Sequence, residues 1–168
     1  MTRLEGDDIP LAFHITFGTY GTRLHGDPRG TVDRAHNRPG DPVLGADPAR
    51  WIRESAAMRF PPIELTLEQR LFVEATIPRV CLRGGWQYHV GAAASEHVHT
   101  MLSAAVDGVS VRKWLKRWLG EALSERWPLP AGQSWWAEGG SVRWVWTEDY
   151  YQTIYDYICQ QRTTRPSP

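Results

Sequence analysis

Apolar and polar positions along the chain follow two periods, which predict four strands and three longer helices. Alternating apolar and polar residues, rich in β-branched and aromatic types, are typical of strands. The predicted strands are residues 11–19, 86–94, 97–105 and 142–146. Apolar residues three and four positions apart are typical of helices that bury one face. The predicted helices are residues 66–84, 110–127 and 148–161.

Capping residues and a short connection indicate where several of these elements begin or end. Thr66, with Gln69 three residues later, forms the pattern of a capping box at the start of a helix. Ser110 and Thr147 are the N-cap residues expected for the next two helices. Residues 95–96 join two strands so closely that they predict an antiparallel hairpin.

The resulting order is strand, helix, strand, strand, helix, strand and a final helix, which is the ferredoxin-like β-α-β-β-α-β pattern plus one helix. We expect an α+β fold in which two helices cover one face of a four-stranded antiparallel sheet and the C-terminal helix covers the other. The length fits a single domain over 1–168. Residues 20–62, dense in Gly, Pro, Asp and Arg, predict a long loop insertion with a helical piece at 49–58. Residues 163–168 predict a short flexible tail.

Composition narrows the class of protein. Hydrophobic residues make up 42% of the chain, enough for a packed core, and no apolar run is long enough to span a membrane. The N-terminal residues lack the apolar stretch of a secretory signal, and Cys81 and Cys159 have no C-x-x-C partner. We therefore expect a cytoplasmic protein with reduced thiols and no membrane association.

Charges are balanced overall and clustered locally. The 19 basic and 19 acidic residues give a formal net charge of +0, which argues against a generic nucleic-acid binder with a basic excess. The candidate DNA-binding residues are Arg112, Lys113, Lys116 and Arg117 on one predicted helix, and Arg23 and Arg34 in the loop insertion. The four helix residues could contact DNA phosphates, or they could form the solvated face of an amphipathic helix, and the sequence favours neither. The two loop arginines could contact a DNA hairpin, or they could belong to a mobile insertion.

The sequence His97-Val98-His99 carries the strongest chemical signal. Strand side chains alternate between faces, so both imidazoles project from one face while Val98 points to the other. Their Cα atoms would lie roughly 6.6 Å apart, which lets both rings approach one metal ion. The C-terminal helix carries Tyr157 and, one turn later, Gln161 on the same face. Because this helix is expected to cover the histidine face, the four side chains should lie together.

These residue types suit metal-assisted cleavage of a phosphodiester. Neutral imidazoles and an amide oxygen are suitable ligands for Mg²⁺ or Mn²⁺ in an open site, where the ion polarises a phosphate. A tyrosine can attack phosphorus as a covalent nucleophile, and a nearby cation favours its phenolate form. His-x-His pairs and helix tyrosines also occur for structural reasons, and Tyr150, Tyr151 and Tyr155 compete with Tyr157 for this role.

Several segments together resemble a known family. Residues 96–99 (EHVH) resemble the HUH signature (histidine, hydrophobic, histidine) of the single-tyrosine transposases, and residues 157–161 (YICQQ) resemble their tyrosine helix. Residues 13–22 (FHITFGTYGT) resemble the first strand of these proteins. Residues 24–34 and 140–146 resemble a subgroup close to the REP-associated tyrosine transposases.

The resemblance covers roughly residues 10–162 and implies one catalytic domain that cleaves and joins DNA strands through a 5′-phosphotyrosine. It implies single-stranded DNA with an imperfect hairpin beside the cut site as the substrate. By transfer, His97, His99 and Gln161 hold the metal ion and Tyr157 is the nucleophile. The overall charge of zero departs from this picture, because it argues against tight nonspecific DNA binding.

Three questions stay open at this stage. His14 on the first strand could support the metal ligands, or it could be an ordinary histidine of the sheet, and the sequence favours neither. The family includes homodimers in which the tyrosine helix of one subunit meets the histidines of the other, so Tyr157 could act within its own chain or across a dimer. A domesticated module that binds DNA hairpins without cutting, or a metal hydrolase in which water attacks, would form no covalent DNA adduct.

Overall fold

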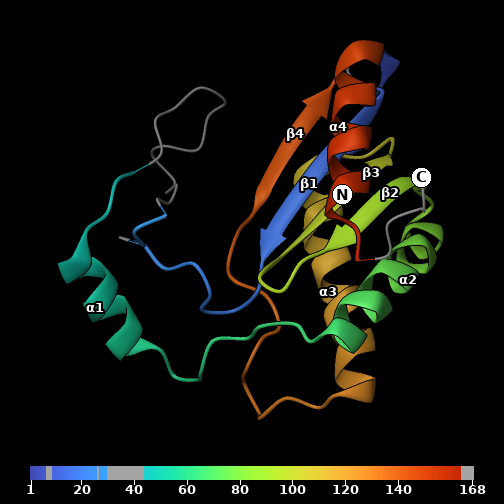
Figure 1. Ribbon diagram of the computed structural model, residues 1–168. Helices are drawn as coiled ribbons and strands as arrows, with labels where there is room; N and C mark the ends of the chain where they lie inside the picture. Colours follow the sequence, from blue (N-terminus) through green and yellow to red (C-terminus); the bar gives the residue numbers. More distant parts are fainter. Residues whose placement is uncertain (7–8, 26, 30–43, 164–168) are drawn as a thin grey trace.

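The computed structural model describes residues 1–6, 9–25, 27–29 and 44–163 and shows an α+β fold. The strands are β1 (Ala12–Gly18), β2 (Gln87–Ala93), β3 (His97–Ser103) and β4 (Ser141–Val145). The helices are α1 (Pro48–Ala57), α2 (Leu67–Gly84), α3 (Gly108–Arg126) and α4 (Glu148–Gln161). The predicted α+β class, the four strands and the C-terminal helix after the last strand are confirmed (Figure 1).

The four strands form one antiparallel sheet in the order β2-β3-β1-β4. The central strand β1 pairs with both β3 and β4. Thr16 of β1 lies opposite His99 of β3, and His14 lies opposite Arg143 of β4. Opposite residues in antiparallel strands share a face of the sheet, so this register decides which side chains meet.

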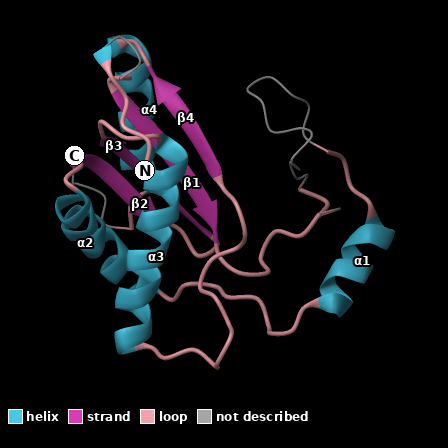
Figure 2. Cartoon of the chain, turned by 180° about the vertical axis from the view of Figure 1, so that it is seen from behind, coloured by secondary structure: helices cyan, strands magenta, loops and turns pink. Residues whose placement is uncertain are grey.

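Strand alternation divides the core into two layers. Phe13, Ile15 and Phe17 of β1 belong to a buried cluster that includes residues of α2 and α3. On the other face, Met101 of β3 belongs to a second cluster with Ile158 of α4. Figures 1 and 2 show α4 on one side of the sheet and α3 on the other. The side chains that alternate with the three apolar residues of β1 therefore project from the face that carries α4.

Two of the three expected helix caps are confirmed. Thr66 Oγ1 accepts a hydrogen bond from the backbone N–H of Gln69 at 3.2 Å, and Gln69 Oε1 accepts one from the backbone N–H of Thr66 at 2.9 Å. This reciprocal pair is the predicted capping box. Thr147 caps α4 by accepting a hydrogen bond from the backbone N–H of Tyr150.

Helix α3 begins earlier than predicted, and the expectation that Ser110 is its N-cap was wrong. The N-cap is Asp107, whose carboxylate accepts a hydrogen bond from the backbone N–H of Ser110 at 2.8 Å. Gly108 lets the helix begin here, because a Cβ atom at this position would lie 2.5 Å from Val142 and 2.9 Å from Phe13. The close approach of the first turn to the sheet thus requires glycine.

The predicted insertion at 20–62 contains α1, which lies away from the sheet (Figures 1 and 2). The expected helical piece at 49–58 is confirmed. Arg34, one of the candidate DNA-binding residues, lies outside the described residues.

Two further expectations concern the chain as a whole. Within the described residues, no helix is long and apolar enough to cross a membrane. Cys81 and Cys159 are free thiols, as expected. Burial raises the pKa of Cys81 to about 12, so this thiol stays protonated and inert.

Candidate functional site

Three histidines from two neighbouring strands meet on one face of the sheet. His14 comes from β1, and His97 and His99 come from β3. The ring centroids of His97 and His99 lie 4.8 Å apart, and those of His14 and His99 lie 5.4 Å apart. His99 is therefore the centre of the cluster, with one ring on each side.

The hydroxyl of Thr16 connects two of these rings. Thr16 Oγ1 lies 3.0 Å from His99 Nδ1 and 3.3 Å from His14 Nε2, and the two ring nitrogens are 3.2 Å apart. The cross-strand register explains this contact, because Thr16 and His99 are direct partners on β1 and β3. The network fixes the rotation of both rings through groups that are already held by the sheet.

The outer nitrogens of these rings lack partners. His14 and His99 are each 7% exposed, and both His14 Nδ1 and His99 Nε2 are buried without a hydrogen-bond partner among the described residues. Burial lowers the pKa of His99 to about 3, and burial together with the positive charge of Arg143 lowers that of His14 to about 4. Burial also lowers the pKa of His97. The imidazoles are therefore neutral at neutral pH, the state in which they bind metal ions.

These pKa values predict that the protein loses stability as the pH falls below 6.5. The unfolded chain binds protons at His14 and His99 near pH 6.5, whereas the folded chain binds them only near pH 4 and 3. Between these limits acid favours the unfolded chain by up to about 1.4 kcal/mol per pH unit for each histidine. Urea denaturation at several pH values between 7.5 and 5 would measure this slope, and His14→Gln should reduce it. If the slope were unchanged in His14→Gln, a lowered pKa of His14 in the folded protein would be contradicted.

Tyr157 of α4 lies against this histidine cluster. Its ring centroid is 5.4 Å from that of His99 and 6.5 Å from that of His14, in edge-to-face geometry. The helix is held by Ile154 and Ile158, which are buried against the sheet, while Tyr157 keeps 44% of its surface exposed. A large molecule can therefore reach the Tyr157 ring while His14 and His99 remain covered.

The other tyrosines of α4 lie elsewhere. Tyr151 packs edge-to-face on His89 of β2 with centroids 5.2 Å apart, and Tyr155 stacks on Tyr151 at 6.3 Å. Among the described residues, Tyr157 is the tyrosine whose ring contacts His14 and His99. This contact distinguishes Tyr157 from the tyrosines that pack on Tyr151 and His89, and its role as the nucleophile stays a prediction.

Gln161, the third proposed metal ligand, makes no contact with the histidine cluster that is seen among the described residues. It lies one turn after Tyr157 on the same face of α4, and it is exposed. In the described part of the chain, no hydrogen bond joins Gln161 to a histidine, and no group of three or more His, Cys, Asp or Glu side chains is arranged to hold a metal ion. A metal site here would need the amide of Gln161 to turn toward the imidazoles.

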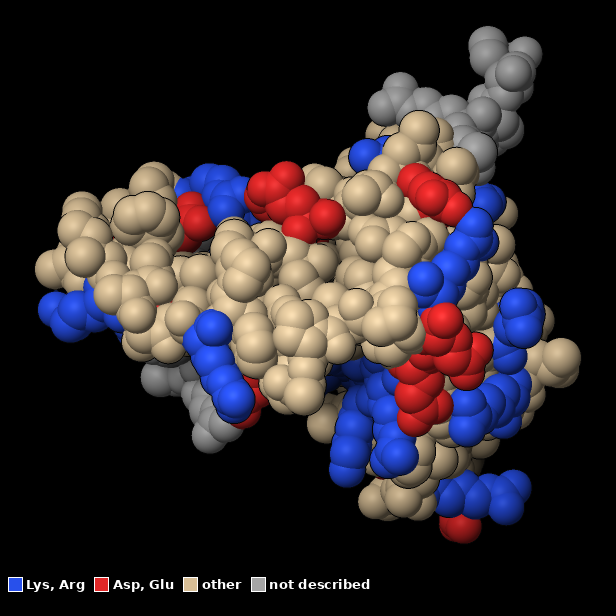
Figure 3. All heavy atoms as spheres, turned by 90° about the horizontal axis from the view of Figure 1, so that it is seen from below, with Lys and Arg blue, Asp and Glu red and all other residues tan. Residues whose placement is uncertain are grey.

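The basic residues of α3 lie on the other side of the sheet from this cluster. Lys116 Nζ donates hydrogen bonds to the carbonyl oxygens of Ala137 and Gly139, and Arg112 donates one to Gly140. Lys113 is exposed, and Arg117 pairs with Glu121 on the same helix at 3.0 Å. Figure 3 shows basic and acidic side chains interleaved on the face seen from below. The role of the α3 residues in DNA binding stays a prediction.

The loop arginine Arg23 lies closer to the cluster. Its positive charge contributes to the lowered pKa of His97, which the negative charge of Glu96 partly offsets. Arg23 is exposed at the start of the insertion. Positive charge therefore reaches the histidine cluster from the loop after β1.

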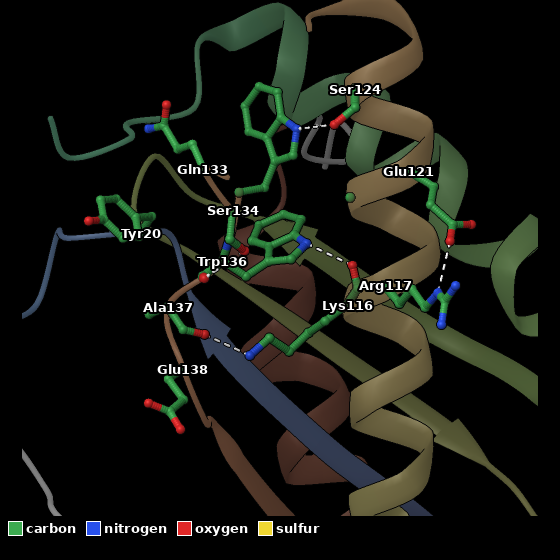
Figure 4. A pocket seen from close by; sticks show the side chains of 12 residues that line it. Tyr20, Lys116, Arg117, Glu121, Ser124, Gln133, Ser134, Trp136, Ala137 and Glu138 are labelled. Atoms are coloured by element: carbon green, nitrogen blue, oxygen red, sulfur yellow. Dashed lines mark hydrogen bonds and ion pairs between the residues drawn. The ribbon is translucent and has the colours of Figure 1, made fainter. Parts of the chain in front are cut away.

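A hollow of about 710 Å³ lies between α3 and the segment before β4, away from the histidine cluster (Figure 4). The indole N–H of Trp136 donates to the carbonyl oxygen of Lys116 at 2.8 Å, and that of Trp135 donates to Ser124 at 3.0 Å. Burial lowers the pKa of Lys116 to about 8. These two hydrogen bonds attach the segment before β4 to α3, so the residues around the hollow stabilise the fold.

Two residues at the cluster were missed in the sequence. Thr16 follows His14 by two positions and so shares its face, which the strand period alone could have shown. Arg143 of β4 is the direct partner of His14, is exposed, and has no acidic partner among the described residues. Its place depends on the pairing of β1 with β4, which no local pattern reveals.

The chain is similar to solved structures but to no family profile or curated protein. Four solved chains match, and one belongs to a structure described as a "putative transposase" from Deinococcus radiodurans R1. That match has 17% sequence identity and a TM-score of 0.47, and it covers 98% of this chain and 100% of the other.

Proposed function

We propose that this protein is a metal-dependent endonuclease and strand transferase of single-stranded DNA, with Tyr157 as its covalent nucleophile. The main observation behind this proposal is the position of the Tyr157 ring. Its centroid lies 5.4 Å from that of His99, and the side chain is partly exposed to solvent. A tyrosine beside neutral imidazoles, which can bind a metal ion, suits metal-assisted attack on phosphorus. The ferredoxin-like interpretation of the fold and the HUH resemblance of residues 96–99 support the same assignment.

The proposed metal ligands are His97, His99 and Gln161, and they fit a divalent ion by their chemistry. His99 Nε2 is a buried ring nitrogen for which the described residues provide no hydrogen-bond partner. Two imidazoles and an amide oxygen leave coordination positions open for phosphate oxygens, which suits Mg²⁺ or Mn²⁺. Such an ion, when bound, polarises the scissile phosphate and stabilises the charge of the transition state.

Thr16 and His14 would prepare His99 for this role. When His99 Nδ1–H donates to Thr16 Oγ1, the other nitrogen of the ring keeps its lone pair for the metal ion. The Thr16 hydroxyl can then donate to His14 Nε2, which lies 3.3 Å away. Hydrogen bonds of this kind fix the tautomer and orientation of metal-binding histidines in other proteins. His14 is thus a supporting residue behind the ligands.

Thr16→Val is expected to weaken metal binding without unfolding the protein. Valine has nearly the same shape as threonine but cannot accept the His99 Nδ1 proton, and loss of such a supporting contact costs about 10- to 100-fold in metal affinity. Titration with Mn²⁺ by isothermal calorimetry would measure the change, with Thr16→Ser as the control that keeps the hydroxyl. Equal affinity in the valine and serine variants would count against the proposed tautomer.

The covalent step follows from the placement of Tyr157. Its phenolic oxygen forms a bond to phosphorus while the bond from phosphorus to the 3′-oxygen breaks. The 5′-phosphate stays on Tyr157, the phenolic proton passes to solvent, and the leaving 3′-oxygen takes up a proton. Because the new bond is again a phosphodiester, a second strand end can reverse the reaction without a nucleotide cofactor.

The surroundings of the cluster suit an extended, negatively charged substrate. Arg143 and Arg23 bring positive charge to it, and the exposed side of Tyr157 is accessible to a flexible strand. The hairpin beside the cut site comes from the family resemblance, and the arginines of the insertion are its proposed contacts. Contacts to phosphates would make binding dependent on salt concentration.

The proposal is tested by incubating the protein with a labelled single-stranded oligonucleotide that carries a hairpin, in the presence of Mn²⁺. We expect a covalent protein–DNA adduct that survives denaturation, and mass spectrometry should locate the phosphate on Tyr157. Binding without an adduct would favour a hairpin-binding module. Cleavage without a protein-linked product would instead favour a hydrolase that activates water.

A further inference from the structure

The chain that leaves α4 crosses from one layer of the protein to the other. Helix α4 covers the histidine face of the sheet, whereas α2 packs on the opposite face. After α4, Thr163 contacts both Ala93 at the end of the edge strand β2 and Glu74 of α2. The helix that carries Tyr157 is therefore tied to a second layer at its C-terminal end.

The tie is built around the buried carboxylate of Glu74, which is 3% exposed. Glu74 Oε1 accepts a hydrogen bond from the backbone N–H of Thr163 at 2.8 Å and another from the backbone N–H of Ala93 at 3.1 Å. Arg162 Nε lies 3.9 Å from the second carboxylate oxygen. We call Glu74, Ala93, Arg162 and Thr163 the Glu74 clamp. One carboxylate thus joins α2, the end of β2 and the end of α4.

Two contacts of the Thr163 hydroxyl reinforce the Glu74 clamp. Thr163 Oγ1 donates to the carbonyl oxygen of Ala93 at 3.1 Å, and it accepts a hydrogen bond from Arg70 Nε at 3.2 Å. A buried carboxylate costs free energy to desolvate. The two hydrogen bonds to Glu74 Oε1 offset this cost only in part, because Glu74 Oε2 and Arg162 Nε are buried without a hydrogen-bond partner among the described residues. This cost suggests that the Glu74 clamp serves a purpose beyond filling the core.

The register of the sheet places the Glu74 clamp beside the proposed metal ligands. Ala93 pairs with Val98, the residue between the two histidines of β3. Thr163 binds Ala93 and lies two residues after Gln161. The end of α4 that carries Gln161 is therefore fixed near the histidine end of β3. The other contacts that hold this end of the helix are apolar ones, which Ile158 and Cys159 make with the cluster on this face.

We propose that Glu74 is a positioning residue, which holds the end of α4 so that Tyr157 and Gln161 stay aligned with the histidines of their own chain. This inference rests on the proposed function for its effect on rate. It makes a separate claim about the mobility of α4, which can be measured without DNA. Glu74 contacts neither metal ion nor substrate in this scheme, so it should affect the rate of the covalent step more than the binding of DNA.

The sharpest test replaces Thr163 by proline. Proline removes the N–H that Glu74 accepts, and Arg162 already has the extended backbone (φ −64°, ψ 143°) that a residue before proline favours. Thr163→Ala is the matched control, because it keeps the N–H and removes only the hydroxyl contacts. For Thr163→Pro we expect adduct formation to slow about tenfold, the effect of roughly 1.4 kcal/mol, while the dissociation constant for the oligonucleotide changes less than about twofold.

Amide hydrogen exchange measures the mobility of α4 without DNA, so it tests the role of the Glu74 clamp independently of the proposed function. In Thr163→Pro, the amides of α4 should exchange faster than in wild type, while those of β1 and β3 should not change. Glu74→Gln keeps an acceptor oxygen and should remain close to wild type in both measurements, whereas Glu74→Ala should resemble the proline variant. If wild type forms no adduct, the proposed function fails and the exchange data still test the clamp.

Two results would overturn the inference. One is a proline variant whose α4 amides exchange as slowly as those of wild type. The other is faster exchange of α4 with an unchanged rate of adduct formation, since the clamp would then hold the helix without serving the reaction. Should the proline variant fail to fold, Glu74→Ala and Glu74→Gln provide the same comparison, and equal behaviour of these two would reject the role of the Glu74 oxygens.

Discussion

Tyr157→Phe is expected to abolish the covalent attachment of this protein to single-stranded DNA. The change removes one oxygen atom and keeps the ring that packs edge-to-face on His99, so the fold and DNA binding should persist. Loss of a nucleophile that acts in a concerted site can cost on the order of a millionfold in rate, and we expect at least a thousandfold here. Adduct formation with a fluorescent oligonucleotide, followed on a denaturing gel, would measure it.

Tyr155→Phe is the matched control for this experiment. Tyr155 lies half a turn away on α4 and stacks on Tyr151 outside the histidine cluster. Its variant should form adduct at close to the wild-type rate. An adduct that persists in Tyr157→Phe, or one that disappears in Tyr155→Phe, would show that the nucleophile has been misassigned.

His99→Ala should eliminate cleavage and reduce Mn²⁺ binding to the level of nonspecific sites. His99 is the central ring of the cluster and carries the buried, unpartnered Nε2. We expect cleavage to fall by at least a hundredfold, because a missing ligand costs more than the 10- to 100-fold typical of a supporting contact. His89→Ala is the control, since His89 bonds Ser103 and packs on Tyr151 away from the cluster.

The same variant shows whose tyrosine reacts. Within one chain, Tyr157 already contacts His99, so each subunit contains the complete set of groups. A mixture of Tyr157→Phe and His99→Ala proteins should therefore remain inactive, even after subunits have had time to exchange. Restored adduct formation in the mixture would show that the tyrosine of one subunit serves the histidines of another.

Much of the fold could be predicted because its elements carry local signals. The capping box at Thr66 and the alternation of β1 and β3 depend on residues that are neighbours in sequence. Alternation also placed His97 and His99 on one face. The start of α3 was missed although Asp107 is a local N-cap, because Gly108 is a poor helix former whose place depends on its fit against β1 and β4.

The candidate site could be predicted only in part for the same reason. The meeting of Thr16 with His99 requires the register between β1 and β3, which is set by packing over the whole sheet. The DNA-binding role of the basic residues of α3 stays a prediction. Arg112 and Lys116 of this helix, however, donate to the carbonyl oxygens of a segment that follows more than twenty residues later. Contacts of that kind depend on loop geometry.

The hydrogen bond from the Ala93 N–H to Glu74 also affects how this molecule behaves among its neighbours. β2 is an outer strand, and the free N–H groups of such strands are templates on which other chains can add and begin to aggregate. At Ala93 this group is occupied by a carboxylate, and the Ala93 carbonyl oxygen accepts from Thr163. The contact that steadies the tyrosine helix thus also closes this end of the sheet to strand addition by another chain.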